Sequence, residues 1–178
     1  IKVPVFSTEK LPQVEVSLGP EMRSTGEVLG VGQNFHEAMY KGFTAAGTTI
    51  PKAGSTILVT VREMDKENFL PIAKKFHELG CKFIATAGTA KLLEDNDIPV
   101  QVAKKISEGV PNILDVIRSG MIDLIIDIPK KGNDIHSDGF KIRRTAIECD
   151  VSIMTSLDTV KALVDVMEHR YTPDTVEV

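Results

Sequence analysis

The chain is poor in the residues that mark several classes of protein. It has no Trp, only 5% aromatic residues and two Cys among its 178 residues. Two cysteines exclude a disulfide-rich scaffold, and the apolar segments around Cys81 and Cys149, with no metal-ligand spacing, predict reduced core thiols. No apolar run approaches the roughly 20 residues of a membrane span, and no signal peptide opens the chain. We therefore expect a cytoplasmic protein without a membrane partner.

Excess positive charge is also lacking. The 21 Lys and Arg residues are outnumbered by 25 Asp and Glu, which gives a net charge of −4 and argues against nucleic acid as a partner. Hydrophobic residues make up 42% and charged residues 26%, the composition of an ordinary globular protein with one substantial core. Because the chain begins at Ile1, in the middle of an alternating pattern, we expect it to be a piece of a longer protein.

The first third of the chain differs from the remainder. Residues 1–32 hold short alternating apolar stretches interrupted by proline, too few to form a core alone. Asn34, with Glu37 three residues later, is typical of a helix start, and residues 48–55 are typical of a linker. The expected organisation is a terminal piece of another domain (1–32), a connecting helix and linker (33–55), a main domain (56–170) and a tail (171–178).

From residue 56 onward, strands alternate with helices. The expected strands are β-branched or apolar, and the segments between them carry helical periodicity. The expected strands are Thr56–Val61, Lys82–Ala85, Pro99–Ala103, Asp123–Ile128 and Val151–Met154. This alternation predicts an α/β fold, a three-layer α/β/α arrangement around a five-stranded parallel sheet.

The segment Phe83–Ala90 is the strongest candidate for a binding site. A strand ends near Thr86, and Gly88 and Thr89 lie where a helix begins. The unpaired N–H groups of a helix start, the positive end of its dipole and two hydroxyls together suit a phosphate. The alternative is that Thr86 or Thr89 simply caps the helix, a common role for threonine.

Further charged residues follow the other strands. Because ligands of parallel sheets bind at the carboxyl ends of the strands, Lys66, Lys105 and Asp127 are expected at the same rim as Thr86. The lysines supply charge for a phosphate, and Asp127 can accept hydrogen bonds from a sugar or base. Each of these residues could instead be an ordinary solvated side chain. His136, flanked by Asp134 and Asp138, gives only a weak hint of acid–base or metal chemistry, and no metal site is expected.

Two stretches resemble one family. Residues 18–28 (LGPEMRSTGEV) resemble the closing segment of the second ATP-grasp half of carbamoyl-phosphate synthase large subunits. Residues 56–168 resemble the methylglyoxal-synthase-like domain that follows it, through the turn Ala85–Ala90, Lys105 before Ser-Glu-Gly, and the Ile-Arg-Arg-Thr-Ala run from Ile142. The resemblance implies the sheet order 3-2-1-4-5.

The resemblance also implies a function. Bacterial members of the family bind UMP or IMP as allosteric effectors in this domain, and the parent enzyme uses ATP with Mg or Mn. Matched positions imply phosphate ligands at Lys66, Thr86, Gly88, Thr89 and Lys105. A second set, on the ribose or base side, comprises Thr60 and Asp127. The family often has asparagine at position 127 and threonine at 129, so these departures bear on which nucleotide binds.

The resemblance implies partners too. They are the nucleotide effector, the rest of the large subunit and a glutaminase small subunit, with a second copy of the chain as a further candidate. The chain alone is expected to hold no cofactor and to catalyse no reaction. One alternative is a methylglyoxal-synthase-like lyase, but the segment matching that enzyme's base-bearing motif is Gly109–Ile113, which holds no carboxylate. The other alternative is a ligand-free oligomerisation module.

Overall fold

A computed structural model describes residues 1–5, 26–129, 137–169 and 171 of the chain. In order along the chain, its elements are β1 (Lys2–Val5), β2 (Gly26–Leu29), α1 (Phe35–Ala45), β3 (Thr56–Val61), the 3-10 turn η2 (Glu63–Asp65), α2 (Lys66–Glu78), β4 (Lys82–Thr86), α3 (Ala87–Glu94), β5 (Val100–Ala103), the 3-10 turn η3 (Ile106–Glu108), α4 (Ile113–Arg118), β6 (Leu124–Ile128), α5 (Asp138–Glu148), β7 (Ser152–Met154) and α6 (Leu157–Glu168).

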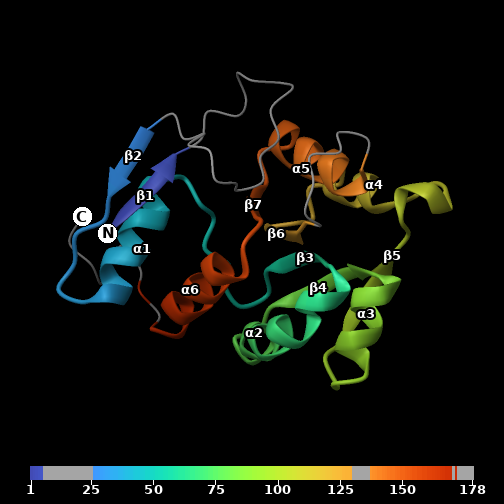
Figure 1. The fold of residues 1–178 in the computed structure, drawn as a ribbon, viewed down its shortest axis with the longest axis horizontal. Helices are drawn as coiled ribbons and strands as arrows, with labels where there is room; N and C mark the ends of the chain where they lie inside the picture. The colour runs from blue at the N-terminus through green and yellow to red at the C-terminus, as the bar shows by residue number, and fades with distance from the viewer. Residues whose placement is uncertain (6–25, 130–136, 170, 172–178) are drawn as a thin grey trace.

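Five strands form one parallel sheet in the order β5-β4-β3-β6-β7. Counted from residue 56, this order is 3-2-1-4-5, so the predicted fold class is confirmed. Strand β3 pairs with β4 on one side and with β6 on the other, so the strand order changes direction at β3 (Figure 1). The carboxyl ends of β3, β4 and β6 therefore share one rim, where such folds bind ligands.

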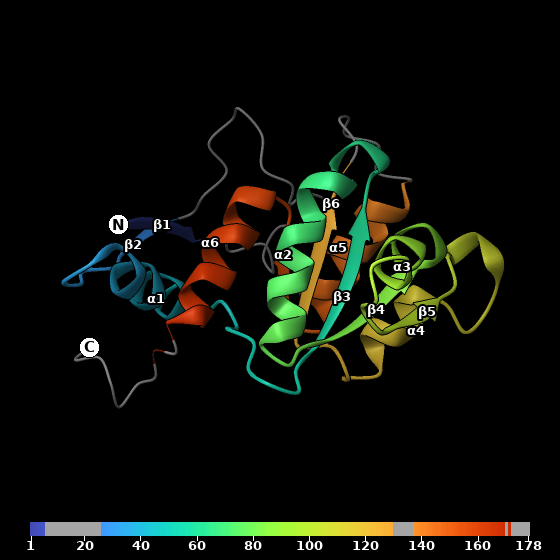
Figure 2. The ribbon, with the colours of Figure 1, turned by 90° about the horizontal axis from the view of Figure 1, so that it is seen from below.

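Helices cover both faces of the sheet, with α2 and α6 on one face and α5 on the other (Figure 2). Successive side chains of a strand point to opposite faces of the sheet, and Ile57, Leu58 and Val59 of the central strand β3 are all fully buried. Both faces of β3 are therefore covered, as is usual in a parallel sheet. Ile57 and Val59 belong to a core cluster that includes residues of α2, α3 and α6. Leu58 belongs to a second cluster with residues of α4 and α5.

Two helices begin earlier than the sequence suggests. Proline is tolerated best in the first turn of a helix, so Pro71 by itself predicts a helix start near Asn68 or a distorted first turn, but α2 runs continuously from Lys66 with Pro71 inside it. Proline there removes one bond to the carbonyl of Glu67, and both residues are exposed, so water can solvate that carbonyl. Helix α3 begins at Ala87, directly after β4, rather than at the expected Thr89.

A small antiparallel pair, β1–β2, lies beside α1. Glycine makes this close packing feasible: a Cβ at Gly30 would stand 2.0 Å from the carbonyl oxygen of Ala38, and one at Gly42 would stand 2.7 Å from Val3 Cγ2. Asn34 caps α1 as predicted, accepting a hydrogen bond from the Glu37 N–H at 3.0 Å. The family-like segment before Gly26 and the tail from residue 172 lie outside the described residues.

No helix in the described part of the chain is both long and apolar enough to cross a membrane.

Candidate functional site

A cavity of about 500 Å³ opens at the carboxyl ends of β3, β4 and β6. It is built where the sequence predicted a site, because parallel strands bring their ends to one rim. Of the predicted residues, four line it: Thr60, Thr86, Lys105 and Asp127. Its other lining residues come from the same strand ends and from α4 and α5: Val61, Arg62, Ile113, Ile128, Pro129, Ser137, Asp138, Gly139, Ile142 and Arg143.

Thr86 lines this cavity at the junction of β4 and α3, and Gly88, in the first turn of α3, is not among the lining residues. Thr86 is both the last residue of β4 and the N-cap of α3, and its side chain makes no capping hydrogen bond. The simple capping role considered for Thr86 is therefore absent from the structure. Because the first N–H groups of a helix have no partners within it, this turn can donate hydrogen bonds to an anion.

The Lys66 ammonium lies close to the same turn. A Cβ added at Gly88 would stand 3.6 Å from Lys66 Nζ, so the lysine reaches the first turn of α3 from the start of α2. Lys66 also donates a hydrogen bond to Glu63 at 2.6 Å, and its side chain is 15% exposed. It is not among the residues that line the cavity, but it contributes positive charge beside Gly88.

Thr89 lies differently from Thr86. Its side chain is 2% exposed, and its hydroxyl accepts a hydrogen bond from the backbone N–H of Val61 at 3.3 Å. This contact ties α3 to the end of β3, and Thr89 does not belong to the cavity lining. The structure thus brings Thr86, Gly88 and Lys66 to one turn and places Thr89 beneath it.

Asp127 is at the centre of a buried polar cluster. It is 4% exposed, and Arg143 of α5 is 2% exposed. Arg143 Nη1 donates to Asp127 Oδ2 at 2.5 Å, and the hydroxyl of Thr60, its register partner on β3, donates to Oδ1 at 2.5 Å. Both carboxylate oxygens are thus engaged by the protein, which compensates much of the cost of burying the charge.

Sequence reasoning gave no role to Arg143 or Gly139. A Cβ at Gly139 would stand 2.8 Å from Arg143 Nη1, so glycine lets the first turn of α5 approach the ion pair. The available signal was the helical spacing of Arg143 with Ala146, which puts a charged residue on the inward face. A buried Arg needs an acidic partner. Asp127, the acidic residue in the apolar strand β6, was the candidate that the sequence offered.

Of the remaining charged candidates, some line the cavity and others lie outside the described residues. Lys105 lies at the start of η3, where its backbone N–H donates to Glu108 at 2.8 Å, and its exposed side chain lines the cavity. Asp138 lines the cavity from the first turn of α5. Asp134 and His136 lie outside the described residues. Within the described part of the chain, no three His, Cys, Asp or Glu side chains are grouped so that they could hold a metal ion.

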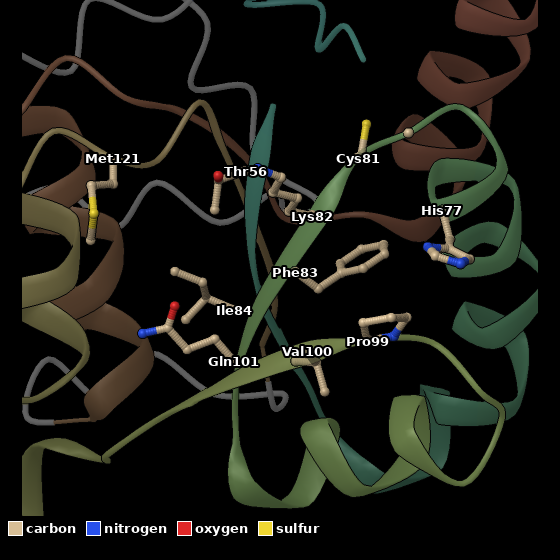
Figure 3. Close-up of a pocket in the computed structure, with 11 residues that line it drawn as sticks. Thr56, His77, Cys81, Lys82, Phe83, Ile84, Pro99, Val100, Gln101 and Met121 are labelled. Carbon is tan, nitrogen blue, oxygen red and sulfur yellow. The ribbon is translucent and has the colours of Figure 1, made fainter. Parts of the chain in front are cut away.

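A second cavity, of about 530 Å³, lies at the opposite, amino-terminal rim (Figure 3). Its lining is largely apolar and includes Cys81, Phe83, Ile84 and Met121. Burial, followed by the negative charge of Asp123, raises the pKa of Cys81 to about 11. A negative charge on Cys81 is therefore disfavoured, and the lining, which also includes Lys82 and His77, is more apolar than that of the first cavity.

Comparison with known proteins agrees with this architecture. A family model described as the MGS-like domain matches residues 68–155. A methylglyoxal synthase from Elizabethkingia anophelis NUHP1 has the same fold, with a TM-score of 0.53 at 18% identity over 70% of this chain and 82% of that one. Residues 68–155 are thus similar in sequence to the MGS-like domain, and the chain shares the fold of that methylglyoxal synthase.

Whole-chain similarity points to particular relatives. The chain is 54% identical over all 178 residues to the carbamoyl phosphate synthase large chain of Clostridium botulinum (strain Loch Maree), of which it spans 17%. It is 55% identical over 169 residues to that of Clostridium perfringens (strain 13), covering 95% of this chain and 16% of the relative. The resemblance inferred from the sequence is confirmed, and the chain corresponds to a small part of these relatives.

Proposed function

We propose that this chain is the nucleotide-binding regulatory region of a carbamoyl phosphate synthase large chain. The observation that carries the proposal is the cavity at the carboxyl rim, where Thr86 stands at the N-cap position of α3 with no capping hydrogen bond from its hydroxyl, and Lys105 lines the same space. A nucleoside monophosphate of the UMP or IMP type binds with its phosphate on the Thr86–Gly88 turn and its ribose toward Thr60 and Asp127.

Electrostatics support this orientation. A phosphate carries close to two negative charges and three acceptor oxygens, which the helix start, Lys66 and Lys105 complement. Each charge-assisted hydrogen bond contributes about 1.5–3 kcal/mol. Asp127, with both oxygens already engaged, repels a phosphate less than a free carboxylate would, and it remains positioned beside the sugar.

The regulatory role requires the longer protein. In this proposal, the effector binds two states of the large chain with different affinities and so changes ATP affinity at a distant site, by roughly 1–3 kcal/mol of coupling. The rest of the large chain, its ATP and Mg or Mn, and a glutaminase small subunit are the proposed partners. Together they make carbamoyl phosphate in the cytoplasm for pyrimidine and arginine biosynthesis.

A lyase function is less well supported. A methylglyoxal-synthase-like reaction needs a carboxylate that can take a proton from a bound substrate. In the matching segment, the nearby Asp115 accepts a hydrogen bond from the Asn112 N–H at 2.8 Å and so caps α4. Asp127 is held by Arg143 and Thr60, and Asp138, the other carboxylate of the cavity lining, lies on α5, outside the segment that matches the base-bearing motif.

Calorimetric titration with UMP and IMP at fixed salt tests the proposal. Lys105→Ala should weaken binding at least tenfold, equivalent to roughly 1.4 kcal/mol, because it removes a charge from the phosphate site. Lys82→Ala is the matched control, since Lys82 is an exposed lysine at the opposite rim. Equal affinity of wild type and Lys105→Ala would reject this site. Failure of wild type to bind any nucleotide would favour the ligand-free module instead.

A further inference from the structure

The cavity at the carboxyl rim carries different charges at its two ends. Thr86, at the junction of β4 and α3, and Lys105, which follows β5, lie on one side of β3. Asp127 of β6 and Asp138, in the first turn of α5, lie on the other side, because α5 contacts β6 and β7. Neighbouring strands are about 4.8 Å apart, so β4 and β6, on either side of β3, are roughly 10 Å apart. A lysine therefore stands at one end of the cavity and carboxylates stand at the other.

The two carboxylates of the lining are held differently. Asp127 is bound by Arg143 and Thr60. Within the described part of the chain, no hydrogen bond or ion pair engages the side chain of Asp138, which is exposed at the mouth of the cavity. An ionised carboxylate accepts hydrogen bonds and donates none. A ligand that meets Asp138 must therefore present donors to it.

The first turn of α5 places Asp138 next to the part of the site assigned to the ribose. A Cβ at Gly139, the following residue, would stand 3.5 Å from Asp127 Oδ2. Ile142, four residues after Asp138 and so on the same face of α5, also lines the cavity and is 3% exposed. Together with the buried Ile113 of α4, it offers an apolar surface to the face of a ring, with Asp138 near the edge of that ring.

We infer that the base of the nucleotide lies at this end of the cavity and that Asp138 makes the site favour guanine. The inference rests on the proposed function, in which the phosphate lies at the Thr86–Gly88 turn and the ribose lies toward Asp127. The base, at the far end of the ligand from the phosphate, then meets the first turn of α5. The Watson–Crick edge of guanine carries two adjacent donors, N1–H and the 2-amino group, which match the two oxygens of one carboxylate.

Other bases match a carboxylate less well. Hypoxanthine has the N1–H but lacks the 2-amino group, so it forms only one of the two hydrogen bonds. Uracil places its N3–H between two carbonyl oxygens, which repel a carboxylate that approaches with both oxygens. Hydrogen-bonding groups in a site discriminate strongly against an analogue that leaves one of them unpaired. The expected order of affinity is therefore GMP, then IMP, then UMP.

Calorimetric titration with GMP and IMP, which differ only by the 2-amino group, tests this inference. The wild-type chain should bind GMP about tenfold more tightly than IMP, because one charge-assisted hydrogen bond is lost with the amino group. Asp138→Asn should reduce this ratio to less than about twofold, because the amide replaces one acceptor with a donor. A general change in the attraction of the phosphate alters both affinities equally, so the ratio reports on the base alone.

Asp158→Asn is the matched control. Asp158 is also exposed and lies in the first turn of a helix, α6, but it does not line the cavity, so the tenfold ratio should remain. Equal affinities of the wild-type chain for GMP and IMP would overturn the inference and leave the phosphate site standing. A tenfold ratio that persists in Asp138→Asn would also overturn it. If the wild-type chain binds no nucleotide, the proposed function fails, and this inference fails with it.

Discussion

The two ends of the parallel sheet hold cavities of nearly equal volume, about 500 Å³ at the carboxyl rim and 530 Å³ at the amino rim, with opposite chemistry. At the carboxyl rim, helices begin, and a lysine, three hydroxyl side chains and an Asp–Arg pair line the space. At the amino rim, α2 ends near Gly80, and the lining is mostly apolar.

Chain direction explains the difference. In a parallel sheet, the helix after each strand starts at the strand's carboxyl end, so unpaired N–H groups and positive dipole ends collect there. Helix carbonyl ends collect at the other rim, where an anion gains nothing. Two cavities of one size can therefore differ in ligand class because of topology alone. The predictions below test this contrast, beginning with the largest expected effect.

Breaking the buried ion pair should cost the most. Arg143→Met or Asp127→Asn should lower the free energy of unfolding by about 3–5 kcal/mol, because each change leaves a buried polar partner without its counterpart. Urea unfolding followed by circular dichroism measures it. The double variant should lose less than the sum of the two single losses. Lys82→Met at the amino rim is the control and should lower the free energy of unfolding by less than about 0.5 kcal/mol. Equal losses of stability for the variants at the two rims would contradict the proposed difference between the rims.

The thiol at the amino rim should be unreactive. With the pKa of Cys81 raised to about 11 from an ordinary 9.0, the thiolate fraction at pH 8 falls about a hundredfold. Alkylation of Cys81 in a Cys149→Ser chain should thus be about a hundredfold slower in the folded than in the unfolded protein. The rate should rise close to tenfold per pH unit up to about pH 11. Fast, pH-independent labelling at neutral pH would contradict this account of the rim.

Removing one hydroxyl should weaken nucleotide binding at the carboxyl rim but not at the amino rim. Thr86→Val should weaken UMP or IMP binding about tenfold, since it deletes a hydrogen bond to the phosphate and keeps the shape of the side chain. Thr56→Val, the same change at the amino-rim cavity, should leave the affinity unchanged. Calorimetry on both variants decides the point, and similar losses for the two would show that the hydroxyl at the helix start has no special role.

The smallest effect concerns a contact away from both cavities. Hydrogen bonds to Glu168 and Asp165 raise the pKa of Lys75 above its ordinary 10.5. Since the folded pKa is the higher one, the stabilisation is fully present below pH 10 and is lost as the pH rises through the folded value. Lys75→Met should cost under about 1 kcal/mol at pH 8, because the pair is partly exposed. The difference in stability between the two proteins should shrink as the pH rises above 10.5 through the higher pKa of Lys75 in the folded protein; a difference that grows with pH would contradict the direction of the shift.

Sequence reasoning recovered the architecture because its signals are local. Buried strands such as β3 and β6 are continuous apolar runs, and the alternation with helices dictates a parallel sheet. It also identified Thr86 and Lys105, because strand ends of such a sheet converge. It gave Asp127 a ligand role without its partner Arg143, which is 16 residues away on another element, since pairings across elements depend on packing. It also missed the burial of Thr89 against the Val61 N–H and the start of α3 at Ala87, because helix ends are hard to predict from sequence.

Amide chemical-shift mapping during a UMP titration tests the central claim most directly. The account predicts the largest shifts at Ala87 and Gly88, in the first turn of α3, and at Lys105, with Lys82 and Gln101 at the other rim unchanged. The same titration with inorganic phosphate should reproduce the shifts at α3 and omit those near Thr60. Shifts concentrated at the amino rim, or spread evenly over both, would contradict a phosphate site at the carboxyl ends of the strands.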